Sequence, residues 1–199
     1  MLYIVGMGPG NIKFLTREAI ETIKEVDEII TFGRIAETAK LIRTPIQCVK
    51  SLTEIVSLID PSKDTAILAS GDACFFGILD YLQKTDVAID LVVPGITSFQ
   101  YLMNRLRKSW HNASFASLHG REQDLASIAK QKMTVILTDK KNTPDSISQK
   151  LYKLGARGEI TVGYNLSYDD EIIIEEKIGV TIPHHSELST IVVEIDSCV

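Results

Sequence analysis

The sequence predicts an α/β protein made of two α/β domains. Short runs of apolar, β-branched residues alternate with longer segments whose apolar residues recur at helical spacing, as expected for alternating strands and helices. A polar passage at 108–112 interrupts this pattern, and after residue 153 the β-type runs follow one another with little helix between them. We therefore expect a domain at 1–110 with a mainly parallel sheet, and a domain at 111–199 with a mixed sheet.

The first half begins with a strand at 2–5, a glycine-rich turn at 6–10 and an amphipathic helix at 16–26. Apolar runs rich in β-branched residues indicate further strands at 28–32, 46–49, 65–69 and 89–93. Helical periodicity indicates further helices at 35–42, 52–58, 75–83 and 96–108. Short apolar strands that alternate with helices are typical of a parallel sheet covered on both faces.

The second half is expected to contain fewer helices. Strands are indicated at 113–117, 133–138, 159–164, 171–178 and 189–195. Helices are indicated at 122–130 and 144–153. The last three strands lack helical crossovers, which favours antiparallel pairing in part of this sheet.

Composition and charge limit the possible functions. The 21 basic and 26 acidic residues give a formal net charge of -5, and the sequence pI is about 5.4. We therefore expect no nucleic-acid partner, because such a partner is a polyanion. The cysteines Cys48, Cys74 and Cys198 are odd in number and widely spaced, which suits a reducing cytoplasm better than a disulfide framework.

The sequence shows no targeting or metal-binding pattern. Residues 1–5 lead directly into the glycine turn, and no apolar stretch has the length of a membrane span, so we expect a cytoplasmic protein without membrane attachment. The four histidines lack metal-ligand spacing, so no metal site is expected. They are His111, His119, His184 and His185.

Glycine-rich turns follow three strands of the first half. The first is Gly6-Met7-Gly8-Pro9-Gly10, which lacks the lysine of a phosphate loop and the glycine spacing of a dinucleotide fingerprint. The second is Ser70-Gly71-Asp72, where the Asp72 carboxylate could bind a ligand or merely cap the next helix. The third is 93–98, where the hydroxyls of Thr97 and Ser98 have the same two interpretations. Three such turns together predict a ligand crevice, since open α/β sheets bind ligands at the carboxyl ends of their strands.

A local cationic segment runs from Leu91 to Arg121 and contains no Asp or Glu. We interpret Arg105, Arg107 and Lys108 as one solvated helix end. His119 and Arg121 follow the first strand of the second half, and we expect them to contact an anionic substrate.

With these segments in view, the chain resembles the tetrapyrrole methylase family over nearly its whole length. The resemblance depends on Gly6 to Gly10 with Leu15-Thr16, on Ser70 to Asp72 with Phe76-Gly77, and on 94–98 and 117–121. It implies two α/β domains of the class III methyltransferase type, with S-adenosylmethionine bound in the cleft between them and S-adenosylhomocysteine as product. Cobalt is implied only within the substrate.

The resemblance also implies the site residues. For the cofactor they are Pro9, Ser70, Gly71, Asp72, Phe75, Thr97 and Ser98 from the first domain, and Leu137, Gly163, Tyr164, Asn165 and Leu166 from the second. The catalytic candidates are Asp72, His119 and Arg121, of which the last two are also expected to bind the carboxylates of a corrinoid substrate. No catalytic triad is expected, because in-line methyl transfer depends on orientation and a dry pocket more than on a strong acid or base.

Within the family, the chain is most similar to the subgroup that methylates carbon 5 of cobalt-precorrin-7 in anaerobic cobalamin biosynthesis. The segments 117–121, 138–144 and 165–171 carry this similarity. The chain departs from the subgroup at Ala73, where proline is usual, and at Tyr164 and Asp169, where glutamate and proline are usual. The family implies a homodimer, and we expect the neighbouring carbon-15 chemistry in a separate methyltransferase and decarboxylase.

Two alternatives remain open at this stage. The chain could be another member of the family, acting on a different precorrin carbon, on uroporphyrinogen or on ribosomal RNA, although its acidic charge disfavours RNA. It could also be a nucleotide-binding or corrinoid-binding module without catalytic activity.

Overall fold

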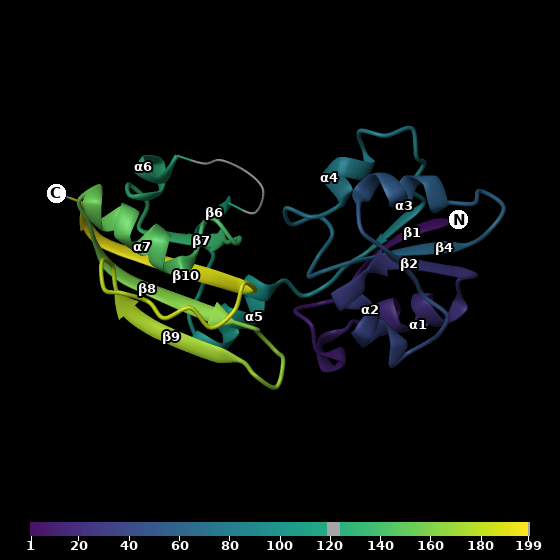
Figure 1. Ribbon diagram of the computed structural model, residues 1–199, viewed down its shortest axis with the longest axis horizontal. Helices are drawn as coiled ribbons and strands as arrows, with labels where there is room; N and C mark the ends of the chain where they lie inside the picture. Colours follow the sequence, from purple (N-terminus) through teal and green to yellow (C-terminus); the bar gives the residue numbers. More distant parts are fainter. Residues whose placement is uncertain (119–123, 199) are drawn as a thin grey trace. The chain divides into compact units, whose positions relative to one another are not determined.

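The computed structural model describes residues 1–118 and 124–198 of the chain. They form two compact units, Met1–Ser98 and Phe99–Val199, each built around its own five-stranded sheet (Figure 1). The predicted α/β fold class is confirmed. None of the helices in the described part of the chain could span a membrane.

The first unit contains a sheet in the order β3-β2-β4-β1-β5. All of its strand pairings are parallel, as predicted. The strands are β1 (Leu2–Gly6), β2 (Glu28–Phe32), β3 (Gln47–Val49), β4 (Thr65–Ala69) and β5 (Leu91–Val93). The connections are η1 (Ile12–Phe14), α1 (Arg17–Glu25), α2 (Gly33–Lys40), α3 (Leu52–Leu58) and α4 (Leu79–Leu82).

Two apolar cores cover the two faces of this sheet. One core packs Ala19 and Ile23 of α1 against Leu68 of β4. The other packs Ile55 of α3 against Ile67 of the same strand. Successive strand residues point to opposite faces, so β4 is buried on both sides. Helices α1 and α2 lie on one side of the sheet, and α3 and α4 lie on the other (Figure 1).

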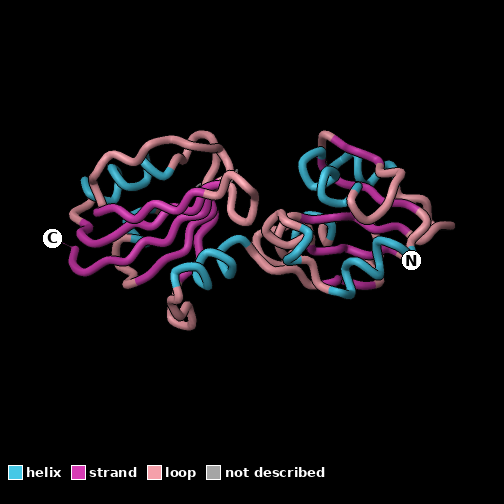
Figure 2. Tube along the Cα trace, turned by 90° about the horizontal axis from the view of Figure 1, so that it is seen from below, coloured by secondary structure: helices cyan, strands magenta, loops and turns pink. Residues whose placement is uncertain are grey.

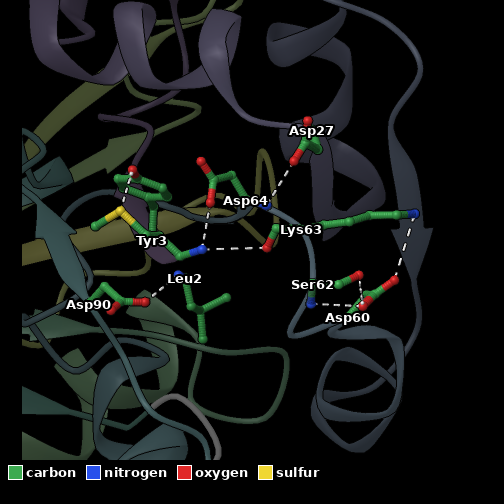
Figure 3. A network of polar contacts seen from close by, with 9 residues as sticks. Leu2, Tyr3, Asp27, Asp60, Ser62, Lys63, Asp64 and Asp90 are labelled. Atoms are coloured by element: carbon green, nitrogen blue, oxygen red, sulfur yellow. Dashed lines mark hydrogen bonds and ion pairs between the residues drawn. The ribbon is translucent and has the colours of Figure 1, made fainter.

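Acidic side chains hold the chain where it enters the strands of the first sheet (Figure 3). The Leu2 amide donates to Asp90 Oδ2 at 2.6 Å, and the Asp64 amide donates to Asp27 Oδ2 at 2.9 Å. The α-amine of Met1 pairs with Asp64 Oδ1 at 2.5 Å. These carboxylates lie at the amino ends of the strands, the edge opposite to the glycine turns, and they are engaged in structural contacts.

The second unit contains a mixed sheet in the order β6-β7-β10-β8-β9, as predicted. Only β6 and β7 are parallel, and the other pairings are antiparallel. The strands, magenta in Figure 2, are β6 (Ser114–Ser117), β7 (Met133–Leu137), β8 (Ala156–Tyr164), β9 (Ile172–Lys177) and β10 (Ser189–Cys198). The helices are α5 (Ser98–Leu106), α6 (Leu125–Ile128) and α7 (Pro144–Lys153).

Helix α5 packs with the second unit, so the compact units divide at Ser98 and Phe99, whereas the sequence prediction put the boundary at 110–111. The reason lies in its side chains. The Phe99 ring lies 5.3 Å from that of Trp110 and 4.9 Å from that of Phe115 in β6. The sequence pattern gives helix positions but does not reveal which sheet a helix packs against.

The predicted helix at 75–83 is much shorter than expected, since only 79–82 is α-helical. Two backbone features explain the difference. Phe76 has a φ of +51°, outside the right-handed helical region. Gly77 lies so close to the preceding turn that a Cβ there would be 2.5 Å from the Ala73 carbonyl oxygen. The segment before α4 is therefore a tight turn next to the candidate site.

Candidate functional site

Three glycine turns meet at the carboxyl edge of the first sheet, after the adjacent parallel strands β4, β1 and β5. Gly8 and Gly71 exchange two backbone hydrogen bonds, with N to O distances of 3.1 and 2.8 Å. A Cβ on Gly95 would lie 2.0 Å from the Gly71 carbonyl oxygen, and a Cβ on Gly6 would lie 2.6 Å from the Gly95 nitrogen. The three turns are thus packed backbone to backbone, which only glycine permits.

Asp72 joins two of these turns through its carboxylate. Its Oδ1 accepts the Cys74 amide at 2.8 Å, within its own turn, and its Oδ2 accepts the Gly95 amide at 3.0 Å. The capping alternative from the sequence is wrong, because α4 begins at Leu79 without a side-chain cap, and the Asp72 side chain instead accepts an amide within its own turn. It also makes a long-range bond to the turn after β5, which the sequence did not predict.

The other predicted cofactor residues of the first unit lie on the same turns. Pro9 is buried, Ser70 is exposed and Thr97 is 5% exposed. The Phe75 ring packs edge-on against Phe76, with 4.8 Å between centroids. Ser98 is the first residue of α5. The structure therefore brings these predicted residues to one edge of one sheet.

The cofactor implied by the resemblance fits this edge in one specific respect. Gly71 has a φ of +66°, and among the described residues beyond its chain neighbours, only Thr97 Cα, at 3.6 Å, would lie within 4 Å of a Cβ at this position. A side chain there would fill open space between two turns, which is where a ligand can approach the backbone closely. The exposed Ser70 hydroxyl lies beside it.

The second unit aligns its own predicted residues at one end of its sheet. Thr190 of β10 pairs with Leu137 of β7 on one side and with Gly163 of β8 on the other. A Cβ on Gly163 would lie 2.6 Å from Leu166 Cδ2, so Leu166 folds back against the strand. Leu137, Gly163 and Leu166 therefore form one small region, although they are far apart in sequence.

The side chains of Tyr164 and Asn165 have structural partners. Tyr164 is 1% exposed and donates from its hydroxyl to the Pro183 carbonyl at 2.9 Å. Burial, followed by the charge of Asp145, raises the pKa of the Tyr164 phenol. Asn165 donates from Nδ2 to Asp170 at 2.6 Å and accepts from the Ser186 hydroxyl at 2.6 Å. A cofactor would therefore meet the backbone at these two positions.

His119 and Arg121, the predicted substrate and catalytic residues, lie outside the described residues. The last described residue before them is Leu118, whose amide donates to the Leu137 carbonyl at 2.8 Å. The Asn142 side chain donates to the Leu118 carbonyl at 3.3 Å. The chain is thus held at the end of β7, beside Leu137, immediately before the predicted substrate residues.

The interpretation of Arg105, Arg107 and Lys108 as a solvated helix end holds for the two arginines, which are exposed, but not for the partly buried lysine. Two of the three side chains also have ion-pair partners. Arg105 Nε lies 3.6 Å from Glu171 Oε1, and Lys108 forms an ion pair with Glu194 on β10. Only Arg107 is an exposed side chain with no ion-pair partner among the described residues. The carboxylates come from distant strands, so a reading of the local sequence could not identify them.

Sequence reasoning also missed Tyr101 as a polar residue of interest. It is 5% exposed, its oxygen accepts a hydrogen bond from Arg105, and its hydroxyl donates one to Glu171. One signal was present in the sequence, since Tyr101 lies one helical turn after Ser98. Within 1–118 and 124–198, no group of three His, Cys, Asp or Glu residues is arranged to hold a metal ion.

Solved structures share this architecture. A precorrin-6Y methylase from Archaeoglobus fulgidus superposes with a TM-score of 0.80 over 99% of both chains, at 23% identity. A uroporphyrin-III C-methyltransferase from Thermus thermophilus, solved with S-adenosylhomocysteine, gives a TM-score of 0.74 over 96% of both chains, at 22% identity. The fold is that of the class III methyltransferases.

The similarity to known methyltransferases extends to the sequence. A family model described as "Tetrapyrrole (Corrin/Porphyrin) Methylases" matches residues 1–180, and the chain belongs to this family of S-adenosylmethionine-dependent methyltransferases. A probable cobalt-precorrin-7 C(5)-methyltransferase from Methanocaldococcus jannaschii is 29% identical over 87% of each chain. The cobalt-precorrin-7 C(5)-methyltransferase of Salmonella typhimurium is 28% identical over 87% of this chain and 89% of its own.

Proposed function

We propose that this protein transfers the methyl group of S-adenosylmethionine to carbon 5 of cobalt-precorrin-7. The supporting observation is the combination of identity and extent, since a cobalt-precorrin-4 C(11)-methyltransferase also matches 86% of the chain but at only 23% identity. Relatives named for this reaction match 87% of the chain. A probable cobalt-factor III C(17)-methyltransferase of similar identity, 31%, matches only 49% of it. The segments at 138–144 and 165–171, in the second unit, favour the same assignment.

The proposed cofactor residues would act by orientation. S-adenosylmethionine would supply an activated methyl group, so the protein needs neither a nucleophile nor a metal for the transfer. The turns at Gly8, Gly71 and Gly95 offer backbone groups at glycines, where no side chain covers them, and Asp72 bonds two of these turns together. The segment 163–166 and Leu137 are proposed to add contacts from the second unit.

The proposed substrate is an anionic corrinoid that carries several carboxylates. The acid-free sequence between Leu91 and Arg121 supports this proposal, as does the position of His119 and Arg121 immediately after Leu118. Asp72 is a weaker catalytic candidate, because both of its oxygens already accept backbone amides. We further propose a cytoplasmic homodimer without nucleic-acid or membrane partners, working beside a separate carbon-15 methyltransferase and decarboxylase.

The decisive experiment is anaerobic incubation of the protein with carbon-labelled S-adenosylmethionine and each candidate cobalt-precorrin. We expect a gain of one methyl group on cobalt-precorrin-7 by mass spectrometry, with the labelled carbon assigned to C5 by NMR. Label at another carbon would reassign the protein within the family. Tight S-adenosylhomocysteine binding without methylation of any precorrin would favour the non-catalytic alternative.

A further inference from the structure

The carboxylate of Glu171 lies at the centre of a polar cluster in the second unit. Its Oε2 accepts the Ser167 amide at 2.6 Å, and its Oε1 lies 3.6 Å from Arg105 Nε. The Tyr101 hydroxyl also hydrogen-bonds this carboxylate. Arg105 in turn donates from Nε and Nη2 to the Tyr101 oxygen, at 2.8 and 2.5 Å. One carboxylate therefore links helix α5 to the turn between β8 and β9.

That turn has a costly backbone conformation. Asn165 and Ser167 have φ values of +45° and +73°, in the left-handed region that non-glycine residues rarely occupy. Such positions persist only where surrounding contacts hold them, and they concentrate at functional sites. Here the Glu171 carboxylate fixes the Ser167 amide, and the Tyr168 amide donates to the Asn165 carbonyl at 3.0 Å.

The residues held in this way are those predicted to meet the cofactor. Asn165 and Leu166 precede Ser167 directly, and Leu166 packs against Gly163. The other end of the cluster is on α5, whose first residue is Ser98, also a predicted cofactor residue. Tyr101 follows Ser98 by one helical turn on the same helix. Two predicted cofactor segments are thus connected to one carboxylate.

We propose that Glu171, supported by Tyr101 and Arg105, is a positioning residue that keeps the 165–167 turn in the conformation competent to bind S-adenosylmethionine. This inference rests on the proposed function for the identity of the cofactor and for its contact with Asn165 and Leu166. Glu171 acts through the Ser167 amide and the turn, and it takes no part in methyl transfer. Tyr101 is shielded from water and links the carboxylate to α5.

Calorimetric titration with S-adenosylhomocysteine tests the proposal without a corrinoid. We expect Glu171→Ala to raise the dissociation constant about tenfold or more, because it removes a charge-assisted hydrogen bond that holds a strained turn. Glu171→Gln keeps an acceptor for the Ser167 amide and should recover part of the affinity. Tyr101→Phe should reduce the affinity for S-adenosylhomocysteine less than Glu171→Ala does.

Glu194→Gln is the matched control. Glu194 pairs with Lys108, two residues after the end of α5, and is 27% exposed, against 21% for Glu171. Its position on β10 pairs with Glu159 of β8, several residues before the 165–167 turn. We expect the Glu194→Gln variant to bind S-adenosylhomocysteine with the affinity of the wild type. In turnover assays, the Glu171 variants should raise the KM for S-adenosylmethionine and leave the KM for the acceptor unchanged.

The outcomes separate this inference from the proposed function. If the wild type binds S-adenosylhomocysteine and folded Glu171→Gln and Tyr101→Phe bind it equally well, the positioning role is overturned and the proposed function stands. If Glu171→Ala does not fold, the affinities of Glu171→Gln and Tyr101→Phe test the positioning role. If the wild type itself does not bind S-adenosylhomocysteine, both the inference and the proposed function fail.

Discussion

The Asp72 carboxylate accepts the Gly95 amide at 3.0 Å and so ties the turn after β4 to the turn after β5. These two turns follow strands that are not neighbours, because β1 lies between them in the sheet. The Gly6 backbone fills the space between them, and a Cβ there would lie 2.8 Å from the Gly71 oxygen. A single side chain therefore fixes an edge that is otherwise built from backbone.

Asp72→Ala should loosen this edge. The change leaves the Cys74 and Gly95 amides without their acceptor, and we expect a loss of about 1–3 kcal/mol in the free energy of unfolding. Urea denaturation measures this loss, and S-adenosylhomocysteine affinity should fall with it. Asp72→Asn keeps one acceptor oxygen and should be milder. Asp86→Ala, at an exposed position before β5, is the control, and an equal loss there would refute the bridging role.

Gly71→Val should weaken cofactor binding. Its φ of +66° disfavours any L side chain by about 1–2 kcal/mol, and the branched side chain would occupy the open space between the turns. Calorimetry with S-adenosylhomocysteine measures the effect. Gly33→Val is the control, because Gly33 has no atoms within 4 Å of a built Cβ and begins α2. Unchanged affinity in a folded Gly71→Val protein would contradict this prediction.

Periodicity was sufficient to predict most of the fold. The predicted strand at 28–32 and the predicted helix at 144–153 coincide with β2 and α7, because each has a clear apolar period and polar ends. Prediction from periodicity was wrong for most of 75–83. There the backbone approaches closely at Gly77, which is not compatible with a continuous helix, and the hydrophobic pattern does not reveal this approach. Periodicity describes local preference and contains no information on such approaches.

The candidate site was predictable only as a set of turns. The carboxyl ends of parallel strands lie at one edge of a sheet, so turns that follow these strands meet there. The meeting of Gly8, Gly71 and Gly95 could therefore be expected. The bond from Asp72 to Gly95 and the cluster around Glu171 could not, because each depends on side-chain geometry between segments distant in sequence. Motif similarity marked 165–171 as important but gave no role to its last residue.

Arg121→Ala should reduce turnover and leave S-adenosylhomocysteine affinity nearly intact. A charge-assisted pair with a substrate carboxylate would be lost, which corresponds to about a ten- to hundredfold fall in kcat/KM. Lysine should rescue only part of the loss, because it keeps the charge without the planar geometry. Single-turnover methylation and melting temperature are measured on the same protein.

Arg107→Ala controls for the loss of a positive charge in the same acid-free segment, and its turnover should remain that of the wild type. If Arg121 instead makes a local structural contact, its alanine variant would melt at a lower temperature and retain normal activity per folded molecule. That result would remove Arg121 from the substrate site.

Lys108→Met should lower stability at neutral pH but not at strongly alkaline pH. The hydrogen bond to Glu194 raises the pKa of the Lys108 ammonium above its value in the unfolded chain, despite the opposing effect of burial. A raised folded-state pKa contributes stability that is fully present below the unfolded value, about 10.4, and is lost as pH rises through the folded value. The difference in unfolding free energy between wild type and variant should be about 1 kcal/mol at pH 7, and it should shrink above pH 10. Urea titrations from pH 7 to 11.5 measure this difference.

Lys130→Met is the control, because Lys130 is exposed and has no carboxylate partner among the described residues. Its free energy of unfolding should equal that of the wild type at both ends of that pH range. If the gap for Lys108→Met stays constant to pH 11.5, the contribution comes from packing of the lysine stem, and the ion pair with Glu194 contributes no measurable stability.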